Sequence, residues 1–173
     1  MTSRLLVDKI EGKSTTGTVD FPSGTMVQQV NSVDNASVSD RVYQTTTSQS
    51  ATHFSNFDIT ITPKFASSKI FYTGSFSVYG NSSAYIYLYL YRHVSGGSAT
   101  RISTSAHGNG AVSQNVYQMF PLVQMDSPNT TNAVTYKIYA RSHNGGSVYV
   151  GWENTAGAAL DNQTNFCVFE IRA

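Results

Sequence analysis

The stretch AYIYLYLYR, residues 84–92, alternates between tyrosine and aliphatic side chains. Successive side chains of a β-strand point to opposite faces, so this pattern gives a strand with one phenolic and one aliphatic face. A helix would scatter the same residues around its axis, because helical neighbours recur every three or four positions. The phenolic face carries Tyr85, Tyr87, Tyr89 and Tyr91. The aliphatic face carries Ile86, Leu88 and Leu90, which we expect in the core.

The same alternation recurs in FDITIT, KIFYTGSFSVY and AVTYKIYARS. The inward-facing residues predicted there are Phe57, Ile59, Ile61, Ile70, Tyr72, Phe76, Val78, Val134, Tyr136, Ile138 and Ala140. Turn-forming segments such as GNSS, SGGSA and HNGG separate roughly seven or eight short strands, and no helical pattern of three turns occurs. Pro121 is expected to break or bulge the strand NVYQMF before LVQM. The pattern predicts an all-β protein, an antiparallel β-sandwich or jelly roll.

Composition narrows the class of protein. The 173 residues fit one domain, and 12% charged residues with a net charge of +1 argue against a nucleic-acid-binding surface. Cys167 is the single cysteine, so no intrachain disulfide can form, and we expect this residue to be a small buried hydrophobe. No apolar run of 18 or more residues is present, which predicts no membrane insertion.

The first residues differ from the rest. LLVDKI and TVDFPSGTMVQQV are separated by the Ser/Thr/Gly segment KSTTG, which is typical of an extended arm. We predict an N-terminal anchoring arm over residues 1–30 and a single sandwich domain over residues 31–173. The predicted anchoring side chains are Leu5, Leu6, Val7, Ile10, Val19 and Phe21. An alternative is that LLVDKI and TMVQQV are edge strands of the sandwich itself.

Several short motifs resemble those of small virion proteins and fibre modules of tailed bacteriophages, notably of marine and cyanobacterial hosts. They are LLVDKIEGKSTTGTVDFPSGTMVQQV at residues 5–30, ITPKFASSKIFYTGSFSV at residues 61–78, and the terminal FEIRA. The resemblance implies an all-β virion structural subunit, assembled in the host cytoplasm as a homotrimer. It implies contact with other virion proteins, as a capsid decoration, short tail fibre or spike. The middle of the chain, including the tyrosine strand, has no such match.

The sequence contains no recognisable catalytic or metal-binding pattern. His53, His93, His107 and His143 lie in separate segments without ligand spacing, and no G-x-S-x-G motif occurs. A carboxylate pair for glycoside hydrolysis could involve Glu153, Asp161 or Glu170, but surface solubilising groups are the simpler interpretation. The loops 126–132 and 161–165 are rich in oxygen ligands yet lack a calcium-loop pattern. We therefore expect no enzyme activity, no cofactor and no metal.

Two roles remain for the exposed aromatic residues. A half-exposed row of four tyrosines would leave an apolar patch of roughly 300 to 500 Å² in water, so we predict that Tyr85, Tyr87, Tyr89 and Tyr91 form a subunit interface. The alternative function is a carbohydrate-binding module for host-surface polysaccharide, with Trp152 and Tyr149 as candidate glycan contacts. A glycan hydrolase is a third hypothesis, disfavoured by the missing catalytic constellation.

Overall fold

The computed structural model describes residues 22–32, 43–81, 84–103, 111–112, 115, 117–151 and 164–173. Every regular element in these ranges is a β-strand, which confirms the predicted all-β class. No helix long and apolar enough to cross a membrane occurs in these ranges. The strands are β1 Met26–Ser32, β2 Gln44–Thr46, β3 Thr52–Ile61, β4 Lys69–Gly80, β5 Ile86–Val94, β6 Ala99–Arg101, β7 Ala111–Val112, β8 Tyr117–Asp126, β9 Val134–Ser142, β10 Val148–Val150 and β11 Asn165–Ile171.

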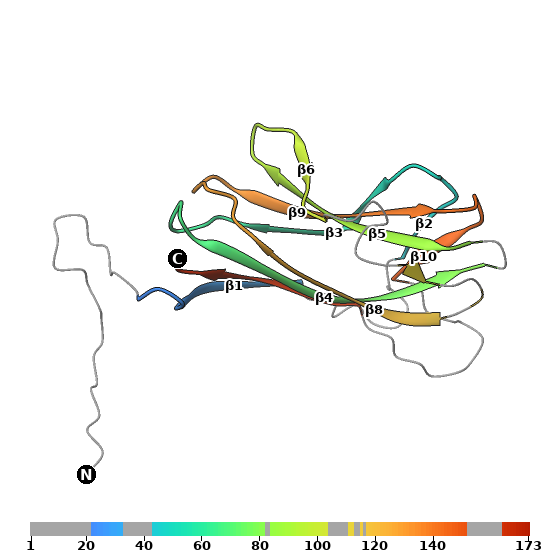
Figure 1. Ribbon diagram of the computed structural model, residues 1–173, viewed down its shortest axis with the longest axis horizontal. Helices are drawn as coiled ribbons and strands as arrows, with labels where there is room; N and C mark the ends of the chain where they lie inside the picture. Colours follow the sequence, from blue (N-terminus) through green and yellow to red (C-terminus); the bar gives the residue numbers. More distant parts are fainter. Residues whose placement is uncertain are drawn as a thin grey trace, which may run out of the picture.

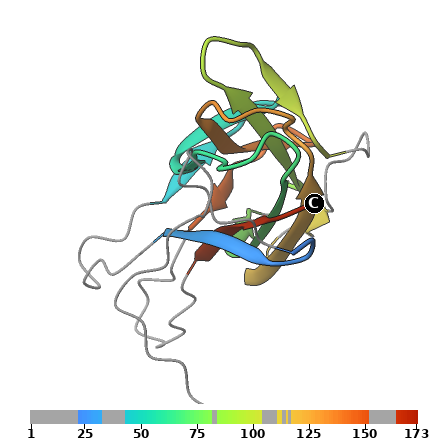
Figure 2. The same cartoon turned by 90° about the vertical axis from the view of Figure 1, so that its left-hand side faces the viewer.

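The strands form two antiparallel sheets packed face to face (Figure 1). Sheet A has the order β1-β11-β4-β10-β2, and β8 pairs with β4. Sheet B has the order β3-β9-β5-β6, and β7 pairs with β5. β8 pairs along nearly all of one edge of β4. The other edge of β4 is shared by β11 and β10. Seen from one end of the sandwich, the β5–β6 hairpin projects beyond the layer of sheet B (Figure 2).

The core lies between the two sheets and follows the alternation read from the sequence. Ile86, Leu88 and Leu90 are buried, as are all eleven inward residues predicted for β3, β4 and β9. The rings of Phe57, Phe76 and Phe166 meet near the middle, with centroids 5.6 to 6.3 Å apart. Each buried aliphatic or aromatic side chain contributes about 1.5 to 3 kcal/mol of transfer free energy, so this continuous cluster is what holds the layers together.

Two sequence-based expectations are wrong in detail. Pro121 does not interrupt its strand, because β8 is an edge strand in which a missing N–H can face away from the partner. Cys167 is half-buried on the outer face of sheet A, since the inward positions of β11 are taken by Phe166, Val168 and Glu170. β1 spans residue 30 and pairs with β11 as an edge strand of the sandwich, as the alternative interpretation of TMVQQV predicted.

Candidate interaction surfaces

The motifs at residues 5–30, 61–78 and the terminal FEIRA each contribute residues around the buried carboxylate of Glu170. Gln28 on β1 donates to Glu170 Oε2 at 2.6 Å. The backbone N–H groups of Lys64 and Phe65 donate to Oε1 at 2.8 and 3.1 Å. Gln28 also donates to the carbonyl of Thr62 at 2.7 Å. Glu170 is completely buried and fully engaged with these donors, so its place is structural and it is not a candidate catalytic acid.

Arg172 extends this cluster to the end of the chain. Its guanidinium lies 4.2 Å from the ring centroid of Phe65 and donates to the Ser67 hydroxyl at 2.8 Å. The Arg172 backbone exchanges hydrogen bonds with the turn before β1, at Gly24 and Thr25. The φ of Gly24 is +87°, a value that non-glycine residues rarely adopt. The motifs PSGTMVQQV, TPKFASSK and FEIRA are thus one structural unit that fixes β1 to the sandwich.

A second buried polar group pins the two sheets together. Asp126 at the end of β8 accepts from Arg92 on β5 at 2.8 Å and from the Tyr136 hydroxyl on β9 at 2.8 Å. Burial, followed by the Asp126 charge, raises the pKa of Tyr136 well above its usual value. Burial also raises the pKa of Tyr72, whose hydroxyl has no hydrogen-bond partner among the described residues. These groups stabilise the interior and do not form an open site.

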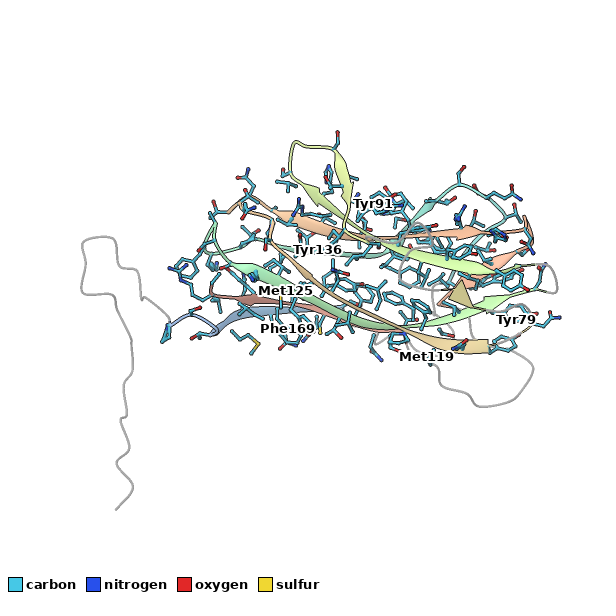
Figure 3. The ribbon with its side chains drawn as sticks, viewed as in Figure 1. Tyr79, Tyr91, Met119, Met125, Tyr136 and Phe169 are labelled. Atoms are coloured by element: carbon cyan, nitrogen blue, oxygen red, sulfur yellow. The ribbon has the colours of Figure 1, made fainter. Side chains whose placement is uncertain are left out.

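The tyrosine row of β5 lies on the outer face of sheet B, as its alternation requires. Figure 3 shows Tyr91 on this outer side and Tyr136 between the sheets. Exposure within the row is uneven: Tyr85 is 37% exposed, Tyr87 and Tyr91 are half-buried, and Tyr89 is 3% exposed. Residues of the same chain therefore already cover part of the phenolic face. The predicted subunit interface through all four tyrosines stays a prediction, and Tyr89 has almost no surface to offer it.

Cations and further aromatic rings surround the row. Arg141 on β9 lies 4.8 Å from the Tyr87 ring centroid, and Arg101 on β6 lies 5.8 Å from that of Tyr89. The Tyr91 and Tyr139 rings are 4.2 Å apart, and His53 stacks on Tyr139 at 5.1 Å. These contacts reach across β3, β9, β5 and β6, so the face is a continuous aromatic and basic surface.

One acidic group interrupts this surface. Asp58 on β3 accepts from His53 Nε2 at 2.7 Å, and Lys137 Nζ is 3.6 Å from its other oxygen. A register shift in the β3–β9 ladder between Phe54 and Ile59 brings His53 and Asp58 together. Together with Lys137, the pair forms a partly exposed polar cluster on the outer face of sheet B.

The outer face of sheet A has a different character. Six large apolar residues of the described chain are well exposed, and five lie in or beside sheet A: Met26, Tyr43, Tyr117, Val123 and Met125. Figure 3 shows Phe169 and Met119 on the same outer side. Among the outward-facing positions of the sheet A strands, Lys69 at the start of β4 carries the one charge. This face therefore carries exposed apolar side chains among uncharged polar ones such as Thr73 and Ser75, and almost no charge.

A line of four tyrosines crosses one end of that face. The rings of Tyr43 and Tyr149 are 6.1 Å apart, those of Tyr149 and Tyr79 are 5.8 Å apart, and Tyr79 stacks on Tyr117 at 4.3 Å. Tyr149 was predicted as a glycan contact, and its ring neighbours are Tyr79 on β4 and Tyr43 just before β2. Sequence alone did not reveal the group, since its members come from four separated segments.

A shallow groove of about 520 Å³ lies on the outer face of sheet A. Thr73, Gly74 and Ser75 on β4 form its floor, Pro121 and Val123 on β8 form one wall, and β1 and β11 form the other. A side chain at position 74 would meet the Phe166 Cβ at 2.8 Å, so glycine permits the close packing of β4 against β11. The groove contains no ionisable group except the Cys167 thiol, whose pKa burial raises.

Most of the remaining predicted site residues lie outside the described part of the chain. Trp152, Glu153 and Asp161 lie outside the described residues, as do His107 and all six anchoring residues from Leu5 to Phe21. Within the described ranges, no group of three or more His, Cys, Asp or Glu side chains could hold a metal ion. The structure thus presents two separate candidate surfaces, the outer face of sheet A and the basic aromatic outer face of sheet B.

Comparison with known proteins gives structural likenesses only. No family model matches the chain, and no curated protein matches it. Solved structures that it resembles include the infectious bursal disease virus Gx strain, at 11% identity and a TM-score of 0.47, covering 96% of this chain and 42% of that chain. The VP2 subviral particle of the same virus matches at 12% identity and a TM-score of 0.44, with coverages of 96% and 42%.

The T13 particle of that virus matches at 11% identity and a TM-score of 0.46, covering 96% of this chain and 40% of that chain. The chain thus spans less than half the length of these three proteins. At such identities and TM-scores the likeness supports no conclusion about function. The resemblance to tailed-phage proteins stands apart from it and rests on the sequence motifs alone.

Proposed function

We propose that the protein is a non-enzymatic structural subunit of a bacteriophage virion, a capsid decoration or a short tail-fibre or spike protein that assembles as a homotrimer. Support comes from the motifs at residues 5–30 and 61–78 and from the terminal FEIRA, which resemble small tailed-phage virion proteins. Three parts of these motifs form one structural unit around Glu170 in this chain.

The observation that carries the proposal is the apolar, nearly uncharged outer face of sheet A. Met26 is 57% exposed, Val123 54% and Met125 44%. A monomeric soluble protein rarely exposes a contiguous apolar patch larger than a few hundred Å², and larger patches mark sites of association. A face without like charges can meet another subunit without electrostatic repulsion. We therefore place the principal subunit contact on sheet A and not on the tyrosine row of β5.

The N-terminal arm fits the same arrangement. It precedes β1, which is an edge strand of sheet A held by Gln28 and Glu170. An extended segment can add as a strand to the sheet edge of a neighbouring subunit, where main-chain hydrogen bonds provide affinity. In this proposal, Leu5, Leu6, Val7, Ile10, Val19 and Phe21 anchor the subunit to its neighbours or to other virion proteins.

The test is the mass of the full-length protein in solution, measured by light scattering and sedimentation. A species near three times 18.8 kDa is expected for the wild type. Val123→Asp with Met125→Asp should give monomers, because two carboxylates would have to be buried in the contact. Ser95→Asp with Ser98→Asp, in the exposed turn between β5 and β6, adds the same charge elsewhere and should leave the trimer intact. A wild-type protein that is monomeric at all concentrations would refute the proposal.

A further inference from the structure

The charges of the described residues are unevenly distributed between interior and surface. Three carboxylates are described: Asp126 bonds Arg92 and Tyr136, Glu170 is buried, and only Asp58 lies at the surface. Six cationic side chains besides Arg92 lie at or near the surface: Lys64, Lys69, Arg101, Lys137, Arg141 and Arg172. Three of these six, Arg101, Lys137 and Arg141, belong to the outer face of sheet B. That face is complementary to an anionic partner.

The geometry of the cations indicates a partner with repeated charges. Lys137 is already close to Asp58, which leaves the two arginines as the main anion contacts. Arg141 pairs with Tyr87 and Arg101 with Tyr91 in the strand register, on opposite sides of β5. Four residues of strand separate these positions by about 13 Å along β5. A small anion could contact one guanidinium only, whereas a polymer lying along the tyrosine row could contact both.

The rings between the arginines favour a sugar polymer. Tyr85 is exposed, and Tyr87 and Tyr91 are half-buried. A tyrosine ring offers an apolar face with a polar tip, a combination suited to stacking against a sugar ring while the hydroxyl bonds to its substituents. Arg141 is held in place by a hydrogen bond of 3.3 Å to the Gln49 carbonyl. A guanidinium fixed in this way loses less entropy when it pairs with a carboxylate or sulfate.

We propose that the outer face of sheet B binds an acidic polysaccharide, with sugar rings against Tyr85, Tyr87 and Tyr91 and acid groups paired with Arg101 and Arg141. Single-stranded nucleic acid would use similar groups, but it relies on many phosphate contacts. Two available arginines in a chain of net charge +1 suit a more sparsely charged polymer. The proposal rests on sheet B alone and does not depend on the assembly assigned to sheet A.

The test compares carboxymethyl-dextran with unmodified dextran of the same length by titration calorimetry on the full-length protein. Binding of the carboxymethylated polymer, weakened by salt, and no binding of dextran are expected. Arg101→Gln with Arg141→Gln should weaken binding by about tenfold or more, since each charge-assisted contact is worth about tenfold. Lys64→Gln with Lys69→Gln removes the same charge away from this face and should change affinity by less than about twofold.

Two further measurements keep the outcome decisive. Tyr85→Ser, at an exposed position that does not endanger folding, should weaken binding severalfold without changing the melting temperature. The Val123→Asp, Met125→Asp variant should still bind, even if it no longer forms trimers, so a failure of the assembly proposal is distinguishable from a failure of this one. Absent binding, an equal loss in the lysine control, or tighter binding of a single-stranded oligonucleotide would overturn the proposal.

Discussion

Gln28 donates a hydrogen bond of 2.6 Å to Glu170, joining residues 142 positions apart in the sequence. The contact links the edge strand β1 to β11, and the same carboxylate holds the loop after β3 through two backbone N–H groups. The motifs that resemble tailed-phage proteins therefore meet at one point of the fold. In this chain these residues therefore have a structural role, since they hold the edge strand β1 and the loop after β3 to β11.

Glu170→Gln should lower the free energy of unfolding by about 1 to 3 kcal/mol, because one carboxylate oxygen becomes an N–H group facing the Gln28 donor. Urea denaturation measures the change. Lys64→Ala is the matched control, since Lys64 uses its backbone N–H and its side chain is exposed. Equal stability of the Glu170→Gln variant and the wild type would show that the carboxylate is not needed at this junction.

Tyr136→Phe and Tyr72→Phe make a contrasting pair of the same chemical change. Removing the Tyr136 hydroxyl deprives Asp126 of one of its two side-chain hydrogen-bond partners, so a loss of about 1 to 2 kcal/mol is expected. The Tyr72 hydroxyl is buried without a partner among the described residues, so its removal should be neutral or stabilising. Thermal melts of both variants measure the change in stability. Equal losses of stability in the two variants would contradict the different roles assigned to the two hydroxyl groups.

Alkaline pH should destabilise the fold through the same two residues. The pKa values of Tyr72 and Tyr136 are raised, so both phenols stay protonated in the folded chain above about pH 10, where unfolded tyrosines ionise. The folded state then binds more protons than the unfolded state, and stability falls as pH rises. Each tyrosine contributes a slope of about 1.4 kcal/mol per pH unit. Urea titrations between pH 9 and pH 11 on the Tyr72→Phe, Tyr136→Phe double variant should show a shallower decline.

Tyr89→Ser should affect folding, whereas Tyr85→Ser should not. Tyr89 is 3% exposed beneath Arg101, and truncation of a buried aromatic ring costs about 3 to 5 kcal/mol. Tyr85 is 37% exposed, so its loss should change stability by less than about 0.5 kcal/mol. Chemical denaturation measures the effect on folding stability, and sedimentation measures the effect on subunit association. If Tyr89→Ser instead dissociated an otherwise stable protein, the predicted interface through the tyrosine row would be correct.

Sequence alternation was sufficient for the core but not for the surfaces. Ile86, Leu88 and Leu90 could be placed inside because a period of two depends only on the strand itself. The burial of Tyr89 could not be read from its own strand, because its surroundings include residues of other strands, such as Arg101 of β6 at 5.8 Å from its ring centroid. The line from Tyr43 to Tyr117 depends on the register of four strands, and local sequence carries no information about such register.

The candidate surfaces were predictable only in part. The row on β5 was visible because its tyrosines alternate within one strand, while the apolar face of sheet A combines residues of β1, β4, β8 and β11. Pro121 was misread for a related reason. A proline disrupts a central strand but is tolerated at an edge, and strand order cannot be read from the residues around it.

The position of Pro121 limits how copies of this protein can grow into larger structures. In β8, an exposed strand edge, proline leaves a gap in the row of backbone donors that another strand would need. Strand-by-strand extension into an endless fibril is thereby hindered, and contact through the flat face of sheet A is favoured. Under the proposed assembly, a contact of that kind closes once the face is covered, which favours assemblies of finite size.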